Sequence, residues 1–398
     1  MNIQRVKYRD IEQIPRLHVQ QQFKQDFQGS APAPFIGKFG YPKVNIGILS
    51  PQFLGDVSSY DSPRQWSAQN TSIGDVASRR YSLVNSRTSW NVKAVHQSHR
   101  FLDIVKEVGM AKRSVAVEVS LQKQPKLDVK SEREIIPFGP ASEIKSAQLT
   151  GNPSVDSRAE RVVADTDLKA APALLQLYRK GFEENFLTKL ISTANVGLQQ
   201  SRKLVPTRWS ITAVDDTLGK QLIAEVKDFP IGEYLAYFGG GWGNYYLVLF
   251  FPQVWSYELF ETYLDKAVNP WSKNGYRYST DFEGYEGRKT YAEECAGGYY
   301  AARLPILEKI KELKRQQACL VLRFITPEYN VPLGVWVCRE AARKSLVAPP
   351  LRFSSEELLL TYARALAKKK FSFDLSLLLS TSRLLKEKKE QKQLGEFW

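Results

Sequence analysis

The sequence is poor in the residues that build disulfide frameworks and zinc sites. Its three cysteines, Cys295, Cys319 and Cys338, are odd in number and widely spaced. This pattern excludes a disulfide framework and a cysteine zinc motif, so we expect reduced thiols in an intracellular protein. There are also three histidines in all; His96 and His99 are three residues apart, but no third ligand lies near them. We therefore predict no metal site from these residue types.

Signatures of membrane, secreted and nucleotide-hydrolysing proteins are missing as well. No run of about 18 apolar residues occurs, so no membrane span is expected. Residues 1–28 are charged and rich in glutamine, without the apolar core of a signal peptide. The glycines of 29–47 lack phosphate-loop spacing, and no dinucleotide fingerprint, serine-hydrolase elbow or zinc-protease helix is present. These absences predict a cytoplasmic protein, associated with the nucleoid if it binds DNA.

What the sequence does have is apolar mass and positive charge. With 398 residues, 43% hydrophobic and 12% aromatic, it can form one large domain or two. The net charge of +14 favours polyanionic partners through neutralisation of phosphates, so we predict contact with DNA. The alternative is a lysine-rich, solubilising surface. Part of the excess positive charge lies near the end of the chain, at Lys368, Lys369, Lys370, Lys386, Lys388 and Lys389.

Apolar spacing predicts an α+β fold, with a mixed sheet core packed with helices, a helical C-terminal region and a flexible tail. The predicted helices cover 101–110, 154–164, 168–178, 184–194, 255–263, 297 to about 317, and 354–370, with a further helix after Asp374. The predicted strands cover 114–121, 204–214, 233–238, 244–251 and 318–325. Ser154 is expected to cap the second helix and Ser354, with Glu357, to form a capping box for the helix over 354–370.

The order of these segments divides the chain into five regions. They are an N-terminal arm (1–28), an N-terminal α+β region (29–230), a C-terminal α+β region (231–350), a basic helical segment (351–390) and a terminal peptide (391–398). The polar stretch 270–288 is long enough for a functional loop or lid.

The terminal peptide carries an unusual pair of aromatic residues. Gln391, Leu394, Phe397 and Trp398 follow the spacing Gln-x-x-Leu-x-x-Phe-Trp. Exposed aromatics are costly in water and often anchor in a partner's pocket. The spacing resembles the peptide that binds the sliding clamp PCNA, which implies docking of a short segment that becomes ordered on binding. The alternative is that these aromatics fold back onto the protein's own core.

Several stretches of the body together resemble the archaeal Nre DNA repair proteins. The most specific is Leu-Val-Pro-Thr-Arg-Trp-Ser-Ile-Thr-Ala-Val-Asp-Asp at 204–216, and the others are 35–44 (Phe-Ile-Gly-Lys-Phe-Gly-Tyr-Pro-Lys-Val), 136–140, 287–292, 297–303 and 332–336. The resemblance implies a role in the response to DNA damage together with the sliding clamp. Many members open with a cysteine cluster that looks like a zinc finger. This chain has no cysteine there, so zinc-dependent DNA binding by that route is not carried over.

Candidate residues for chemistry come from residue types alone. Asp215 and Asp216 follow the predicted strand over 204–214, where they would cap the next helix beside Arg208; Asp165 and Asp167 form a second pair. Two neighbouring carboxylates can hold Mg²⁺ for cleavage of a phosphodiester. The alternative interpretation is helix caps and salt bridges around a strand end.

A second candidate set lies in the C-terminal half. Arg288, Tyr299 and Arg303 combine guanidinium groups with an aromatic ring, a set that suits phosphate binding and base stacking. The same residues equally suit a network between helices.

Three hypotheses follow. The first is a clamp-tethered DNA repair factor whose basic body contacts DNA. The second is a metal-dependent nuclease or other hydrolase that acts on DNA or a nucleotide-derived group. The third is an adaptor that binds the clamp and another protein without touching DNA.

Overall fold

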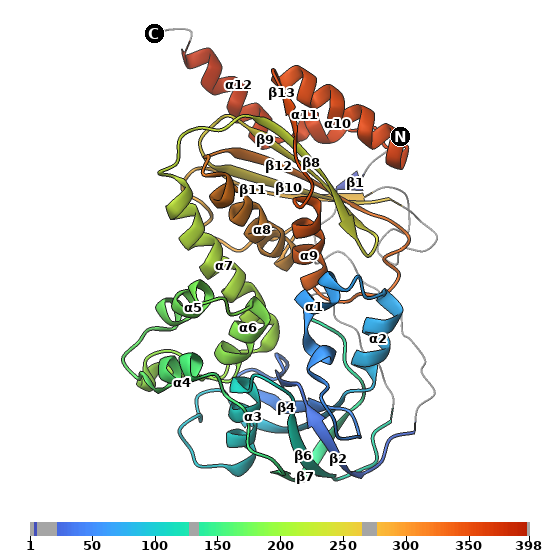
Figure 1. Ribbon diagram of the computed structural model, residues 1–398, viewed down its shortest axis with the longest axis vertical. Helices are drawn as coiled ribbons and strands as arrows, with labels where there is room; N and C mark the ends of the chain where they lie inside the picture. Colours follow the sequence, from blue (N-terminus) through green and yellow to red (C-terminus); the bar gives the residue numbers. More distant parts are fainter. Residues whose placement is uncertain (1–3, 6–21, 127–134, 265–276, 396–398) are drawn as a thin grey trace. The chain divides into compact units, whose positions relative to one another are not determined.

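The computed structural model describes residues 4–5, 22–126, 135–264 and 277–395, and for 391–395 the backbone alone (Figure 1). The chain divides into two compact units. The N-terminal unit holds Pro15–Leu218 with Val331–Gly334, and the C-terminal unit holds the remainder. The five regions expected from the sequence stay predictions.

A six-stranded sheet forms the centre of the N-terminal unit. Its strands are β2 (Asp26–Ala31), β3 (Ala33–Ile36), β4 (Lys43–Ser50), β5 (Val84–Asn91), β6 (Val115–Leu121) and β7 (Ala141–Leu149). They run in the order β2-β6-β7-β5-β4-β3, with β5 and β7 parallel and the other neighbours antiparallel. Helix α3 (Arg100–Met110) contributes its apolar face to the core against this sheet. The alternation at 115–121 and the helix at 101–110 were both predicted correctly.

The other helices of this unit include the predicted helical layer over 154–194 and two helices, over 63–68 and 73–81, that were not predicted. They are α1 (Pro63–Ala68), α2 (Ile73–Tyr81), α4 (Ser157–Ala164), α5 (Ala170–Arg179), α6 (Glu184–Ser192) and the short 3-10 turns at Ser58–Asp61 and Gln199–Ser201. The predicted cap of α4 was wrong by two residues. Asp156, not Ser154, accepts the N–H of Arg158.

The strand predicted at 204–214 is instead the start of helix α7 (Thr207–Val226), which carries the chain from the first unit into the second. The alternation of Trp209, Ile211 and Ala213 suggested a strand. The buried positions, however, include Ser210, Val214, Leu218, Leu222 and Val226, which recur every four residues and define one face of a helix. Asp215 and Asp216 therefore lie inside a helix and do not cap one.

A seven-stranded sheet organises the C-terminal unit. Its strands are β1 (Gln4–Arg5), β8 (Tyr234–Gly241), β9 (Asn244–Phe251), β10 (Ser256–Tyr263), β11 (Arg277–Glu283), β12 (Ala318–Ile325) and β13 (Leu351–Phe353), in the order β1-β11-β10-β12-β9-β8-β13. The strands predicted at 233–238, 244–251 and 318–325 are confirmed.

Two predictions fail in this sheet. Residues 255–263 were expected to form a helix, but β10 pairs with β11 on one side and β12 on the other, so every residue after Ser256 is buried. Pairing on both edges overrides the weak helical spacing. The stretch 270–288 was expected to be a loop, yet β11 occupies 277–283.

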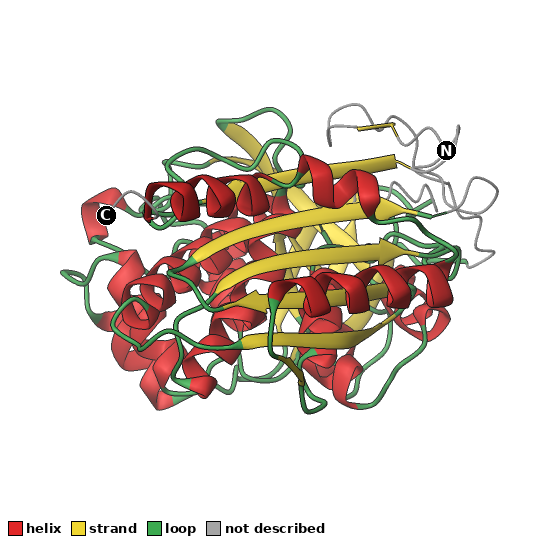
Figure 2. Cartoon of the chain, turned by 90° about the horizontal axis from the view of Figure 1, so that it is seen from above, coloured by secondary structure: helices red, strands yellow, loops and turns green. Residues whose placement is uncertain are grey.

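Helices cover both faces of this sheet. Helices α8 (Gly297–Leu313) and α9 (Trp336–Ser345) lie on one face, and α10 (Glu356–Phe371), α11 (Ser376–Thr381) and α12 (Arg383–Gly395) lie on the other (Figure 1). Figure 2 looks onto the sheet from the α10–α12 side. Alternate residues of β9 and β12, such as Leu249 and Leu322, pack with α10 and α11 in one core. The α+β class is confirmed. None of the helices in the described ranges combines the length and apolarity needed to cross a membrane.

Helix α10 begins with a side-chain cap, whereas α11 does not. Ser355 accepts the N–H of Leu358 at 3.3 Å, so the cap of α10 lies one residue after the predicted Ser354. Asp374 was expected to cap the next helix. It accepts the N–H of Ser376 at 2.9 Å, but the N-cap residue of α11 is Leu375, which makes no side-chain cap.

Helix α12 starts at a buried carboxylate of the sheet. Glu258 of β10 accepts the N–H groups of Arg383 and Leu384, each at 3.0 Å. A negative charge at a helix N-terminus stabilises it. The helix leads directly to the clamp-like peptide: the backbone of Gln391 and Leu394 belongs to α12, whereas Phe397 and Trp398 lie outside the described residues.

Candidate functional site

The N-terminal unit contains a pocket of about 570 Å³, within the range typical of small-molecule sites. Four cationic side chains line it: Lys38, Arg87, Lys126 and Arg208. Three phenylalanines, Phe35, Phe39 and Phe138, provide the aromatic surface. None of the described residues that line it is acidic. We call it the cationic pocket.

One wall of the cationic pocket is the hairpin between β3 and β4. Gly40 has a φ of 82°, and its carbonyl accepts the N–H of Lys43 at 2.9 Å. A Cβ at position 40 would lie 2.6 Å from the carbonyl oxygen of Lys43, so only glycine fits this turn. The turn presents Lys38 and Phe39 beside the pocket.

The inner surface is held by close backbone packing. The rings of Phe35 and Phe138 are 4.5 Å apart between centroids, at 54° to each other. Gly139 donates its N–H to Leu83 at 2.9 Å, and a Cβ there would lie 2.3 Å from the carbonyl oxygen of Tyr81. Phe138 is therefore held against Phe35 by the backbone next to it.

The cations come from separate elements. Arg87 lies on β5, Arg208 in the first turn of α7 and Lys126 after β6. The Nε of Arg87 is buried and makes no hydrogen bond with the described residues, although it forms an ion pair with the carboxylate of Glu143 at 3.6 Å. Such a donor is available to a ligand with an acceptor oxygen.

Exposed aromatic residues gather on the elements that build the pocket. Phe39 is 72% exposed, and Tyr41 and Trp209 are each 45% exposed. The rings of Tyr41 and Trp209 lie 5.2 Å apart, and the Nζ of Lys38 lies 4.9 Å from the ring centre of Phe39. We call Phe39, Tyr41 and Trp209 the aromatic rim. Exposed rings beside cations suit the stacking of unpaired bases.

The second predicted set, Arg288, Tyr299 and Arg303, forms a network in the C-terminal unit, in which the guanidinium of Arg288 lies 5.2 Å from the ring of Tyr299. Arg303 of α8 donates to Glu283 of β11 at 2.7 Å, and both side chains are fully buried. The guanidinium of Arg303 also lies 5.9 Å from the ring of Tyr299, which is itself buried.

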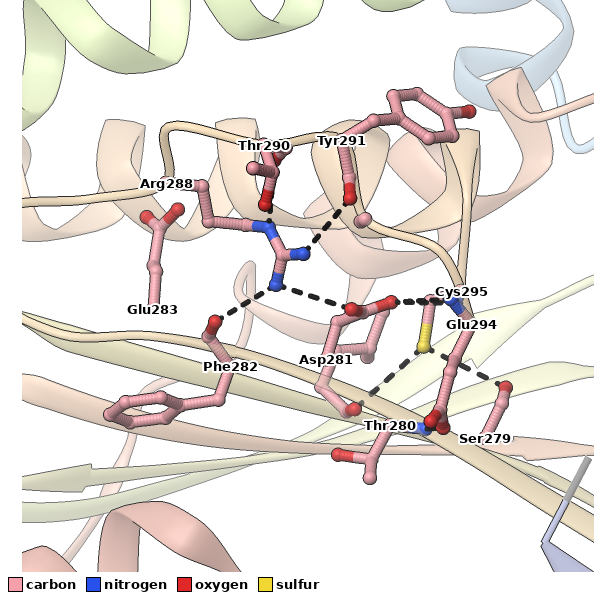
Figure 3. A network of polar contacts seen from close by, with 12 residues as sticks. Ser279, Thr280, Asp281, Phe282, Glu283, Arg288, Thr290, Tyr291, Glu294 and Cys295 are labelled. Atoms are coloured by element: carbon pink, nitrogen blue, oxygen red, sulfur yellow. Dashed lines mark hydrogen bonds and ion pairs between the residues drawn. The ribbon is translucent and has the colours of Figure 1, made fainter. Parts of the chain in front are cut away.

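Arg288 connects the segment after β11 to that strand. It donates to the carbonyl groups of Phe282 and Tyr291, at 2.9 and 3.0 Å, and pairs with Asp281 at 3.2 Å (Figure 3). Burial raises the pKa of Asp281, although the N–H of Cys295 donates to its carboxylate. These contacts support the network interpretation, while a phosphate-binding role stays a prediction.

The aspartates do not form the strand-end site that was expected. Asp215 is fully buried in α7, about two turns after Arg208 on the same helix. Asp165 follows α4, and its carboxylate accepts the N–H of Asp167 in a turn at 3.1 Å. No group of three or more metal-ligating side chains occurs among the residues that the structure describes. The hydrolase hypothesis gains no geometric support from these residues.

The three cysteines form no disulfide bond with one another, and all three are buried. Burial raises the pKa of each thiol, so the reactive thiolate is disfavoured at neutral pH.

Sequence reasoning singled out Arg208 but missed the pocket around it. Arg87, Lys126 and Phe138 carry no local signal of a common site. A signal was nevertheless present, because the stretches 35–44, 136–140 and 204–216, quoted separately for the family resemblance, all contribute to this pocket.

Comparisons with known proteins cover nearly the whole chain. Residues 8–272 match the family profile described as Archaeal Nre, N-terminal, and residues 283–397 match Archaeal Nre, C-terminal. The chain is 38% identical over 325 residues to the DNA repair protein NreA of Haloferax volcanii, covering 80% of this chain and 77% of the relative. It is 35% identical over 387 residues to the DNA repair protein NreB of Archaeoglobus fulgidus, covering 96% and 95%. It is 36% identical over 337 residues to NreA of that organism, covering 84% and 83%. No solved structure matches the chain significantly.

Proposed function

The chain belongs to the archaeal Nre family, and from this premise we propose that it is a DNA repair factor that the sliding clamp recruits and whose body contacts DNA. The curated relatives that support the repair role align over most of the chain and are named DNA repair proteins. Clamp recruitment and DNA contact are the two parts of the proposal that need separate support.

Clamp recruitment is supported by the terminal peptide and by the helix that leads to it. Gln391, Leu394, Phe397 and Trp398 match the clamp-binding spacing at each position. Helix α12 is anchored at its first turn by the buried carboxylate of Glu258. An anchored helix that ends at a short binding peptide tethers the folded body near the clamp, which raises the local concentration of the body at DNA.

DNA contact is carried by one observation, the cationic pocket with its aromatic rim. Cations neutralise phosphates, and exposed rings stack on unpaired bases; a surface with both and no lining carboxylate fits single-stranded DNA. The net charge of +14 adds a long-range attraction for the same partner.

The clamp interaction is tested by calorimetry of the full chain with an archaeal sliding clamp. We expect a dissociation constant in the micromolar range, about −8 kcal/mol, that is lost in the double variant Phe397→Ala, Trp398→Ala. The matched control is Lys392→Ala, Gln393→Ala, which changes the positions between the motif residues and should bind normally. Equal binding by both double variants would remove clamp recruitment from the proposal.

DNA contact is tested by fluorescence anisotropy with a labelled single strand at several salt concentrations. Affinity should fall as salt rises, because bound phosphates release counterions. The double variant Phe39→Ala, Trp209→Ala should weaken binding by about 1–3 kcal/mol for each base that loses its stacking partner. Phe53→Ala removes another exposed ring of the same unit and should have no effect. DNA binding that is absent or insensitive to salt would favour the adaptor hypothesis.

A further inference from the structure

The cationic pocket is open to a ligand the size of one nucleotide. Its volume of about 570 Å³ lies within the roughly 300–1,000 Å³ of sites that enclose small molecules. A double helix presents its bases stacked and paired, so a base reaches a pocket of this size only as an unpaired nucleotide.

The lining matches the two chemical parts of a nucleotide. Phe35 and Phe138 offer aromatic surface with the apolar side chains of Ile36 and Ile135 beside them, which suits the faces of a planar base. The four cations of the pocket suit a phosphate, with no lining carboxylate among the described residues to repel it.

Arg87 has one donor that no hydrogen bond satisfies. Its Nε makes no hydrogen bond within the described part of the chain, although it forms an ion pair with the carboxylate of Glu143 at 3.6 Å. Buried donors in proteins are nearly always hydrogen-bonded, so this nitrogen can still donate to an acceptor from outside the chain. A phosphate oxygen or a base carbonyl supplies one.

The rim favours a strand over a free nucleotide. Phe39 follows the lining residue Lys38 in the hairpin, and Trp209 follows the lining residue Arg208 in α7. Both rings are exposed, as is Tyr41, which contacts Trp209. A mononucleotide in the pocket leaves the rings of Tyr41 and Trp209 unused, whereas the neighbouring bases of a strand stack on them.

We propose that the cationic pocket receives one extruded nucleotide of a single-stranded or locally unpaired DNA, with its base against Phe35 and Phe138 and its acceptor oxygens toward Arg87 and Arg208. The aromatic rim holds the adjacent bases. This inference rests on the proposed contact with DNA and adds to it a recognition site for a single unpaired nucleotide.

The test uses the full-length protein and a short oligonucleotide that contains 2-aminopurine, a base whose fluorescence changes when it leaves the stack. Wild-type protein should bind the oligonucleotide and change its fluorescence. Arg87→Met should weaken binding about tenfold or more and abolish the change, and Phe138→Leu should weaken binding between about fivefold and a hundredfold. Lys180→Met, which removes an exposed cation outside the pocket lining, should behave as the wild type.

Two further experiments show whether a variant has lost its fold and whether the ligand is a strand or a free nucleotide. The stability of each variant is compared with that of the wild type by urea unfolding. Phe138 packs against Phe35, so Phe138→Leu can fail to fold. In that case the test relies on Arg87→Met and the conservative Arg87→Lys, which change a more exposed side chain. The second experiment titrates deoxyadenosine monophosphate, which should bind much more weakly than the oligonucleotide.

The outcomes distinguish this inference from the proposed function. If the pocket variants bind DNA and change its fluorescence as the wild type does, the pocket proposal is wrong while DNA contact stands. If the mononucleotide binds as tightly as the oligonucleotide and Trp209→Ala changes neither affinity, the ligand is a free nucleotide and the strand proposal is wrong. If the wild type binds no DNA at any salt concentration, both proposals fail.

Discussion

The buried network of the C-terminal unit and the cationic pocket of the N-terminal unit place their arginines in opposite settings. In the C-terminal unit, Arg303 pairs with Glu283 and Arg323 pairs with Glu261, all four groups being buried. In the N-terminal unit, Arg87 and the other cations of the pocket face a space without a lining carboxylate. A fully buried ion pair organises the fold, whereas cations that line an open pocket can also contact an anionic ligand.

Aromatic residues follow the same division. In the C-terminal unit, Tyr257 and Tyr299 are fully buried with ring centres 4.9 Å apart, and they fill the space between the sheet and α8. In the N-terminal unit, Phe39, Tyr41 and Trp209 stay exposed. The residue types alone do not separate these roles. Arg288, Tyr299 and Arg303 looked as suitable for a nucleotide as the residues of the pocket do.

The largest expected effect is the loss of stability when a buried arginine of the C-terminal unit is replaced. Arg303→Met leaves the buried carboxylate of Glu283 without its partner and should lower the free energy of unfolding of the C-terminal unit by about 3–5 kcal/mol. The measurement is urea denaturation, with hydrogen exchange of β11 and α8 assigning the transition to this unit.

The matched control for Arg303→Met is Arg383→Met, which removes a 68% exposed partner of Glu387 and should cost at most about 0.5 kcal/mol. Equal losses of unfolding free energy in the two variants would show that burial does not determine how much these ion pairs stabilise the protein.

A second, intermediate effect concerns pH. Burial raises the pKa of Glu258 above its ordinary value of 4.5, despite hydrogen bonds from Ser382, Arg383 and Leu384. Its contribution to stability is therefore complete below pH 4.5 and is lost as the pH rises through the folded-state pKa. The loss is at most about 1.4 kcal/mol per pH unit.

Glu258→Gln removes this titration. The unfolding free energy of the wild type should fall relative to that of the variant as the pH is raised from about 4 to about 8. Urea midpoints of both proteins across that range measure it, and a wild type that gains stability relative to the variant would contradict the prediction. Asp156 of the N-terminal unit shows the opposite pH dependence. Its hydrogen bonds with Arg158 lower its pKa, so any contribution that it makes to stability is lost at low pH.

The smallest effect concerns helix caps, for which the N-terminal unit uses Asp156 at α4 and the C-terminal unit uses Ser355 at α10. Ser355→Ala removes the acceptor for the N–H of Leu358 and should cost about 1 kcal/mol. Ser354→Ala changes the residue that sequence spacing favoured and should cost close to nothing. Thermal melts of the two single variants decide between them, and a larger loss for Ser354→Ala would restore the predicted capping box.

The sequence by itself determined the elements whose signal is local. The period-two burial of β6, the apolar face of α3 and the strands β9 and β12 follow from side-chain spacing within one segment. It also determined the family resemblance and the terminal motif, because both depend on short stretches of consecutive residues.

Only the tertiary structure decided β10, α7 and the pocket. The segment of β10 became a strand because β11 and β12 pair with both its edges, a contact that no local pattern encodes. The start of α7 alternates like a strand, but the helix is set by a buried face that continues to Val226. Arg87, Phe138 and Arg208 lie far apart in the sequence and line one pocket through strand pairing and the packing of α7 against β3, where Thr207 accepts the N–H of Ile36. Local spacing determines which segments are regular, whereas long-range packing determines which of their side chains meet.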